Sequence, residues 1–402
     1  MKRELKPLPF PEFVTLLALM ISMVAMAIDI MLPALGIIGQ DLRVSDPNDT
    51  QLVVSSLFAG FAVGQMFAGP LSDSIGRKMT IYIGYVIFIT GCVISVTAVS
   101  LDAMLVGRVL QGLGAAAPRV ITVAIVRDSH QGRAMARIMS IIMAVFILVP
   151  AIAPAIGQGL IMIAGWHGTF YFLITMAVIG LVWFWFRQPE TLPEAARKPF
   201  SGARILLGIK EICGYRMSVG YALSAGCVFG AFVGYLSTAQ QVFQTTYALG
   251  TLFPLYFGMA ALAIGSASIC NSRIVMRFGM RLLSRRALIA LTVMSGAFLV
   301  PTLLSGGIPP LWMFMVWLLG TFFCIGMLFG NFNALAMEPL GHMAGLGAAL
   351  IGSVSTLLAL PLGWLIGFLY DGTVLPLVGG FAVLGLISFG LMTWTERGRA
   401  SE

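Results

Sequence analysis

The sequence Ala25-Met-Ala-Ile-Asp29-Ile-Met-Leu-Pro33-Ala-Leu35 places one carboxylate inside an apolar run that extends from about Phe13 to about Gly39. A helix rises about 1.5 Å per residue, so a run of this length crosses the hydrocarbon core of a bilayer, which is about 30 Å thick. Asp29 is therefore predicted at membrane depth, where an ionisable side chain is costly and usually belongs to an ion or substrate pathway. The alternative is a buried acid that is paired for structural reasons.

The composition agrees with a membrane protein. Of the 402 residues, 59% are hydrophobic and 10% are charged, whereas a soluble domain carries about 25% charged residues. The five cysteines and three histidines are scattered, so neither a disulfide framework nor a metal or hydrolase centre is indicated.

The formal net charge of +8 is explained by topology. Arg43 is the only basic residue that we place in an outer loop, and Arg108 and Arg119 lie inside a predicted helix. The remaining Lys and Arg residues fall at the termini or in alternate loops, which is the positive-inside bias and predicts both termini in the cytoplasm. Anionic lipid headgroups are therefore the expected partner of this charge, rather than nucleic acid.

Hydropathy predicts twelve helices, and the longest polar stretch, Arg187–Arg216, separates the sixth from the seventh. We expect an N-terminal six-helix half at 1–188, a cytoplasmic linker at 189–213 with a short surface helix near Ala203–Glu211, and a C-terminal six-helix half at 214–402. The predicted helices are 13–39, 52–72, 79–99, 101–126, 135–163, 167–187, 214–244, 250–272, 283–304, 310–337, 343–369 and 374–395.

The two halves repeat one another. The segment Gly69–Lys78 follows the second helix, and the similar segment Arg273–Arg281 follows the eighth, about half the chain away. Two pseudo-symmetric halves around a central site are typical of transporters.

The loop Gly69–Thr80 resembles the cytoplasmic loop motif of the major facilitator superfamily, with Ser74 where that family usually has Arg. The matching residues are Asp73, Gly76, Arg77 and Lys78. Glycine permits a tight turn, and Asp73, Arg77 and Asp128 are expected to form a charge cluster that closes and opens as a gate. The alternative is a basic loop that only sets the topology.

The fourth helix carries Arg108-Val-Leu-Gln111-Gly112-Leu-Gly114, which resembles the proton-coupling motif of the same superfamily. Arg108 and Asp29 are predicted at depths about one helical turn apart, so an ion pair between them, direct or through water, is feasible. Alternatively, Arg108 bonds backbone carbonyls and serves helix packing.

Arg119 lies eleven residues after Arg108 and shares its helix face, close to Gln111 and Thr122. On the first helix, Ser22, Asp29, Pro33 and Gly36 also share a stripe. Polar stripes on apolar helices are expected to face a watery cavity. Three roles remain open for Arg119: it anchors substrate, forms a salt bridge toward the cytoplasm, or extends to the headgroups.

The fifth helix contains Pro150, Pro154 and Gly157, in an arrangement similar to the antiporter motif of the superfamily, with Ala153 before the second proline. Proline removes a helical hydrogen bond and glycine has no side chain, so a bend and close packing are expected here.

The stretch from Ala336 to Gly352 resembles the bicyclomycin/chloramphenicol-resistance (Bcr/CflA) branch of drug:proton antiporters. That branch also carries an aspartate before Leu-Pro-Ala-Leu in the first helix, as Asp29 stands here. Within the stretch, Glu338 and His342 are interpreted as interfacial caps.

Several polar or adaptable side chains are candidates to line a substrate cavity, with interhelical hydrogen bonding as the alternative for each polar one. They are Ser22, Met26, Gln111 and Arg119 in the first half, and Tyr235, Gln240, Asn331 and Asn333 in the second.

The resemblance implies an all-α major facilitator fold of twelve transmembrane helices that works by alternating access in the bacterial inner membrane. It further implies proton-coupled efflux of small amphipathic drugs, such as phenicol-type antibiotics, by a monomer that needs a proton gradient and no cofactor. Asp29 and Arg108 would be the proton-coupling residues. One alternative is uptake of a small metabolite or siderophore by proton symport. Another is a membrane-embedded transferase, for which no cluster of catalytic side chains is visible.

Overall fold

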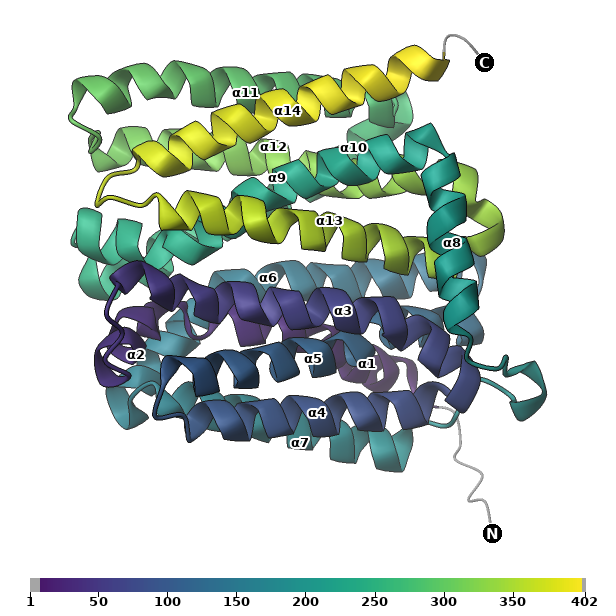
Figure 1. Cartoon of the computed structure of the whole chain (residues 1–402). Helices are drawn as coiled ribbons and strands as arrows, with labels where there is room; N and C mark the ends of the chain where they lie inside the picture. The colour runs from purple at the N-terminus through teal and green to yellow at the C-terminus, as the bar shows by residue number, and fades with distance from the viewer. Residues whose placement is uncertain (1–7, 400–402) are drawn as a thin grey trace. The chain divides into compact units, whose positions relative to one another are not determined.

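The computed structural model describes residues 8–399, and helices make up its architecture (Figure 1). Within that range the helices are joined by short turns and irregular segments, and no strand is present. Twelve helical stretches of residues 8–399 are long and apolar enough to cross a membrane. The prediction of an all-α, multi-pass membrane protein is confirmed.

The helix boundaries lie within a few residues of the predicted ones for most spans. The helices are α1 (Phe10–Asp29), α2 (Leu35–Asp41), α3 (Leu52–Ile75), α4 (Arg77–Val96), α5 (Leu101–Ser129), α6 (Gly132–Ala164), α7 (His167–Arg187), α8 (Gly202–Gly214), α9 (Arg216–Gln240), α10 (Phe253–Phe278), α11 (Met280–Leu304), α12 (Leu311–Met337), α13 (Ala344–Phe368) and α14 (Leu375–Arg399).

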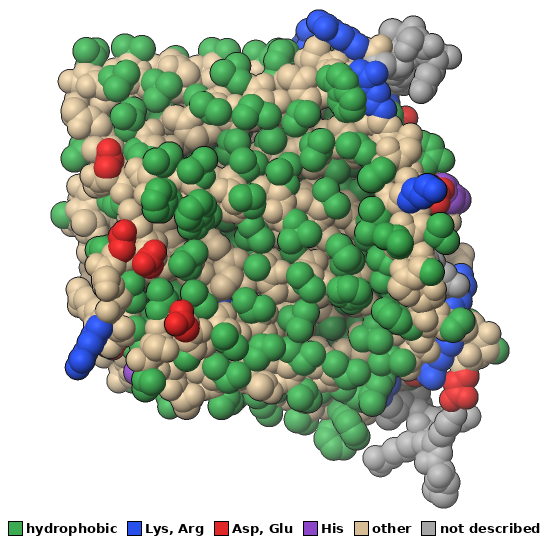
Figure 2. Space-filling model, in the orientation of Figure 1, with side chains coloured by type: hydrophobic (Ala, Val, Ile, Leu, Met, Phe, Trp, Pro, Cys, Tyr) green, Lys and Arg blue, Asp and Glu red, His purple; other side chains and the backbone are tan. Residues whose placement is uncertain are grey.

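Hydrophobic side chains are spread along the helices, whereas charged side chains gather at the helix ends on the face seen in Figure 2. Large apolar residues such as Val86, Val293 and Leu386 are exposed in mid-helix. In a soluble protein such exposure would be unfavourable, but lipid tails solvate these side chains as well as a protein core does.

The prediction of one continuous helix over 13–39 is wrong. α1 ends at Asp29, a 3₁₀ turn occupies Leu32–Ala34, and α2 begins at Leu35. Pro33 has no backbone N–H, so the carbonyl of Asp29 four residues earlier cannot accept a helical hydrogen bond from it. The first span is therefore interrupted directly after its only acid in the apolar run.

The chain forms two compact units. Unit 1 comprises Asp41–Arg43, Ser56–Ile205 and the described part of Met1–Ala34; unit 2 comprises Leu35–Gln40, Val44–Ser55 and the described part of Leu206–Glu402. Two short segments from early in the chain thus belong with the second unit. The predicted division at 1–188, 189–213 and 214–402 stays a prediction.

Small residues bring α4 and α5 together in unit 1. A Cβ added to Gly84 would lie 2.5 Å from the Cβ of Ala117, and one added to Gly107 would lie 2.3 Å from Ser95 Oγ. Such close backbone approach is typical of membrane helices. It places the polar side chains of α5 within hydrogen-bonding distance of α4.

In unit 2, glycines likewise allow close packing between α9 and α13. Gly226, Gly230 and Gly234 recur every fourth residue on α9, and Cβ atoms added to them would lie within 2.7 to 2.8 Å of Leu358, Leu362 and Ile366. α9 continues beyond Gln240 as a π-helical turn, Gln241–Thr246.

Amide hydrogen bonds attach the early segment Val44–Ser55 to the rest of unit 2. Gln51 Nε2 donates to Gln241 Oε1 at 2.5 Å and to Gly367 O at 3.2 Å. Asn48 Nδ2 donates to Tyr370 O at 3.0 Å. These bonds hold the segment Val44–Ser55 against the ends of α9 and α13.

The polar stretch after α7 is largely irregular until α8, which contains the predicted surface helix near Ala203–Glu211. Within unit 2, Gly208 of α8 packs against Leu346, Met343 and Leu350. Leu206 and Leu207 on the same helix are exposed. The location of α8 on the membrane surface stays a prediction.

Candidate functional site

Asp29 is a buried acid at an interrupted helix end. Its side chain is 4% exposed, and it takes part in none of the hydrogen bonds or ion pairs formed among residues 8–399. An ionised carboxylate without partners is costly in such a place. Neutralisation by a proton is the simplest way to remove that cost.

Arg108 lies at the same level of unit 1, fully buried on α5. Its NH1 donates to the backbone oxygen of Ala27 at 3.0 Å and to Gln111 Oε1 at 2.6 Å. Gln111 Nε2 in turn donates to Ser95 Oγ on α4 at 3.0 Å. The chain of bonds links α1, α5 and α4, and it ends on α1 two residues before Asp29.

A direct ion pair between Asp29 and Arg108, one of the feasible arrangements, is absent among the described contacts, and a bridge through water stays a prediction. Arg108 instead bonds a backbone carbonyl, which is the alternative that the sequence left open. The termination of α1 at Asp29 changes the register of the following residues, so a depth estimate from an unbroken helix does not apply. The two groups are linked through the backbone from Ala27 to Asp29.

The antiporter-like segment of α6 packs against this helix end. A Cβ added to Gly157 would lie 1.8 Å from the carbonyl oxygen of Ile30, the residue after Asp29. α6 remains one helix from Gly132 to Ala164 through Pro150 and Pro154. The close packing expected from the motif is therefore present at the interruption of the first span.

Arg119 lies on α5 with its guanidinium carbon 5.2 Å from the ring centre of Phe146 on α6. It is half-buried and forms no hydrogen bond or ion pair with any described residue. A salt bridge toward the cytoplasm, one of its three expected roles, is thus absent in this part of the chain. Phe146 was not recognised from the sequence, because an apolar residue on a lipid-rich helix carries no distinguishing signal.

The other candidate cavity residues of unit 1 are buried. Ser22 and Met26 are 4% and 6% exposed, and Gln111 is fully covered. The hydroxyl oxygens of Ser22 and Thr122 are buried without a hydrogen-bond partner among the described residues. Unpaired buried hydroxyls are uncommon in proteins and mark positions where a ligand or water completes the bonding.

At the end of unit 1 where α3 and α5 terminate, the structure brings Asp73, Arg77 and Asp128 together. Arg77 NH1 lies 2.6 Å from Asp73 Oδ1, and its Nε lies 2.9 Å from Asp128 Oδ2. The arginine is 3% exposed, and it also donates to Ser72 Oγ at 2.6 Å. The charge cluster expected from the loop motif is formed; its role as a gate stays a prediction.

Glu190 completes this cluster and was missed from the sequence. Its two carboxylate oxygens accept hydrogen bonds from the backbone N–H groups of Arg77 and Lys78, each at 3.1 Å. These are free donors at the start of α4, where a carboxylate is favoured. Gly76 has φ of +101°, and a Cβ there would lie 2.6 Å from Glu190. Lys78 Nζ also donates to Gln188 O at 2.6 Å, directly before the predicted linker. Through Glu190 the linker itself is bonded to the loop.

The second-half candidates form bonds within unit 2. Asn331 pairs reciprocally with Asn271 at 2.9 and 3.1 Å, and Gln240 Nε2 donates to Gln244 Oε1 at 3.0 Å. Tyr235 is 1% exposed and packs against Phe322, with ring centres 4.6 Å apart. Asn333 is exposed and donates to its own helix. For Asn331 the geometry favours interhelical bonding over ligand contact.

A second charge cluster lies in unit 2 and includes Glu338, which occupies the C-cap position of α12. Arg281 NH2 lies 2.7 Å from Glu338 Oε2, and its Nε lies 3.3 Å from Glu396 Oε1. Tyr221 donates to the same Glu396 oxygen. His342, also interpreted as a cap, lies 2.6 Å from Glu211 on α8. Glu396 was missed because its partners lie far away in the sequence.

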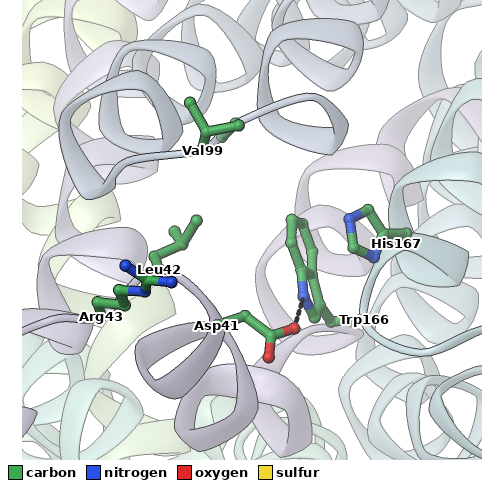
Figure 3. A pocket seen from close by; sticks show the side chains of 7 residues that line it. Asp41, Leu42, Arg43, Val99, Trp166 and His167 are labelled. Atoms are coloured by element: carbon green, nitrogen blue, oxygen red, sulfur yellow. Dashed lines mark hydrogen bonds between the residues drawn. The ribbon is translucent and has the colours of Figure 1, made fainter.

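A cavity of about 370 Å³ lies at the opposite end of α5 from Asp128, within unit 1 (Figure 3). Trp166 Nε1 donates to Asp41 Oδ2 at 2.7 Å, and the ring of His167 stacks on Trp166. Arg43 and Val99 also line the cavity. None of the residues predicted to bind substrate or protons lies there.

Comparisons with known proteins show the family to which this architecture belongs. The family model of the Major Facilitator Superfamily matches residues 17–361. An uncharacterized MFS-type transporter, YdgK, of Bacillus subtilis is 30% identical over 399 residues, covering 96% of this chain and 97% of the relative. A bicyclomycin resistance protein homolog of Haemophilus influenzae is 28% identical over 389 residues, covering 95% and 96%.

The solved structure of a D-xylose-proton symporter superposes with a TM-score of 0.74 at 16% identity, covering 94% of this chain and 95% of the symporter. At that identity the likeness concerns the fold alone. Members of the superfamily are transporters rather than enzymes, and the bacterial relatives indicate a multi-pass protein of the inner membrane. With a family model that matches most of its length and a relative similar over nearly all of it, the chain belongs to the Major Facilitator Superfamily.

Proposed function

We propose that this transporter exports small amphipathic drugs, phenicol-type antibiotics among them, in exchange for protons by alternating access. The observation that carries the proposal is Asp29, which is 4% exposed at the end of α1 and has no partner among the described residues. Intramembrane acids of this kind serve as proton sites in transporters. The likeness to a bicyclomycin resistance protein homolog supports a drug as the cargo.

In this scheme a proton from the outer side neutralises Asp29 and substrate leaves; loss of that proton to the cytoplasm restores the charge and substrate binds again. The change of charge at Asp29 affects Arg108, because Arg108 is bonded to Ala27 O, two residues before the acid. Gly157 against Ile30 O holds the same helix end to α6. A change of charge at Asp29 is thus transmitted to two neighbouring helices.

The Asp73–Arg77–Asp128 cluster would act as a clamp that holds one conformation and releases in the other. A clamp of this kind needs strong bonds in its closed state. Arg77 donates to three side-chain acceptors, and it is only 3% exposed, so water weakens these bonds little. Glu190 extends the clamp to the linker.

The proton gradient would be the energy source, and the working unit would be a monomer whose basic residues contact anionic lipid headgroups. Both termini would lie in the cytoplasm under the positive-inside rule. On this orientation the Arg77 cluster faces the cytoplasm and the Asp41 cavity faces outward.

A pH-jump assay in proteoliposomes tests the proposal. With the lumen more acidic than the bath, an antiporter accumulates radiolabelled chloramphenicol or bicyclomycin inside as protons leave. With the gradient reversed, accumulation is lost. The alternative of proton symport uptake requires the opposite sign, with accumulation only when the bath is acidic. If none of the drugs offered shows a flux that depends on the gradient, drug:proton antiport is contradicted.

A further inference from the structure

We propose that Arg119 and Phe146 form a subsite that recognises an anionic group on an otherwise apolar or aromatic substrate. This inference rests on the proposed function, because it names a class of substrate for the same transporter. A carboxylate or phosphonate attached to a ring is the chemistry that it fits.

The geometry of the pair presents a charged edge next to an apolar surface. The guanidinium carbon of Arg119 stands over the Phe146 ring at 5.2 Å from its centre, within the range of a cation–π contact. The Phe146 ring therefore lies against the guanidinium group. Both side chains are half-buried, and α5 is among the most buried of the membrane spans. The N–H groups at the edge of the guanidinium remain to be satisfied.

No acid of the protein neutralises Arg119 in the described chain. The carboxylates at the end of unit 1 nearest to it are already engaged. Asp73 and Asp128 bind Arg77, Glu12 binds Arg187 through two bonds of 2.6 Å, and Glu190 accepts from backbone N–H groups. An arginine inside a membrane protein without a counter-charge is costly. A negatively charged ligand would remove that cost.

The balance of charges on α1 and α5 also favours an anionic ligand. α1 and α5 carry two guanidinium groups within their apolar stretches, Arg108 and Arg119, and one carboxylate, Asp29. The acceptors of Arg108 NH1 are the neutral oxygens of Ala27 and Gln111. This part of unit 1 thus has an excess of positive charge even when Asp29 is ionised.

The available donors match an oxyanion. The edge of a guanidinium offers two parallel N–H groups, which bind carboxylate or phosphonate oxygens in pairs. Thr122 lies one turn along α5 on the same face, and its hydroxyl is buried without a partner among the described residues. The Phe146 ring beside these donors provides contact for an aromatic or aliphatic substituent.

The test compares biphenyl-4-carboxylate with its neutral analogue, biphenyl-4-carboxamide, for binding to the purified full-length protein in nanodiscs. The two probes share shape and differ in charge. Wild-type protein is expected to bind the carboxylate at least about 10-fold more tightly, since hydrogen bonds to charged groups contribute more than neutral ones. In Arg119→Gln the ratio is expected to fall to about 1. In Phe146→Leu, which keeps apolar volume but removes the ring, the ratio is expected to fall partway.

The matched control is Arg137→Gln. Arg137 also stands over a phenylalanine of unit 1, Phe10, at 5.1 Å, but it is exposed near the start of α6. Its loss removes the same charge and should leave the ratio at the wild-type value. Equal affinity for the two probes in wild type, no saturable carboxylate binding, or an unchanged ratio in Arg119→Gln would overturn the subsite. Failure of the proposed function is distinguishable, because it appears as loss of gradient-driven flux of neutral drugs in wild-type proteoliposomes.

Discussion

Gly157 and Ile30 touch backbone to backbone: a methyl group added to Gly157 would lie 1.8 Å from the carbonyl oxygen of Ile30. This contact ties α6 to the interrupted end of α1, directly after Asp29. Since a carbonyl oxygen of the main chain cannot rotate out of the way as a side chain does, the spacing of the two helices depends on glycine at this position.

Substitution Gly157→Ala should therefore push α6 away from Ile30. Overpacking of this kind costs about 1–3 kcal/mol, so the apparent unfolding temperature should drop and drug transport should fall. Gly159→Ala is the matched control, because a Cβ on Gly159 meets nothing within 4 Å. Equal thermal stability and transport of the two variants would show that α6 can shift without consequence.

Loss of Arg77 should release the clamp in unit 1. Arg77→Gln removes the bonds to Asp73 and Asp128, and hydrogen bonds to charged groups are worth about 1.5–3 kcal/mol each. Cross-linking between cysteines placed at the helix ends near the cluster should change severalfold, while drug binding in detergent persists. Arg127→Gln, which removes an exposed charge from the same end of α5, should leave cross-linking unchanged. Identical cross-linking in the two variants would contradict the clamp and leave the loop with no role beyond setting the membrane topology.

The second charge cluster should matter less for stability than the first. Arg281 is 31% exposed and its partners Glu338 and Glu396 are 45% and 32% exposed, so water screens these ion pairs; exposed pairs contribute about 0–1 kcal/mol. Arg281→Gln should lower the apparent unfolding temperature by less than Arg77→Gln does, and Arg285→Gln, at an exposed position one turn later, should have no effect. A larger drop in unfolding temperature in Arg281→Gln than in Arg77→Gln would contradict the expected order of the two clusters.

The spans could be predicted from the sequence because bilayer thickness fixes helix length, and each apolar run is bounded by polar residues. The interruption after Asp29 could not. Proline occurs inside α3, α5, α6, α11 and α13 without ending them, so Pro33 alone does not distinguish a break from a tolerated proline. At Pro33 the break coincides with a close backbone contact between Ile30 and Gly157 of α6, which follows from tertiary packing and not from local sequence.

The charge cluster of unit 1 was predictable in part. Asp73 and Arg77 are one helical turn apart in a recognisable loop motif, and Asp128 ends a helix on the same side. Glu190 and Phe146 were missed, since their partners are set by the packing of helices far apart in the chain. Similar depths make a direct Asp29–Arg108 ion pair feasible, but depth does not determine where a side chain points, and Arg108 is bonded to the carbonyl of Ala27 on α1.

The most direct test of the account is substrate-induced proton release from purified protein, measured with a pH indicator in weakly buffered solution. Wild-type protein should release protons on addition of chloramphenicol, because substrate and proton compete through Asp29. Asp29→Asn, whose amide resembles the protonated acid and cannot lose a proton in this pH range, should bind drug more weakly and release no protons even at saturating drug. Asp102→Asn, at the exposed start of α5, should release as much as wild type. Full proton release by Asp29→Asn would contradict the account and place the coupling site at another acid.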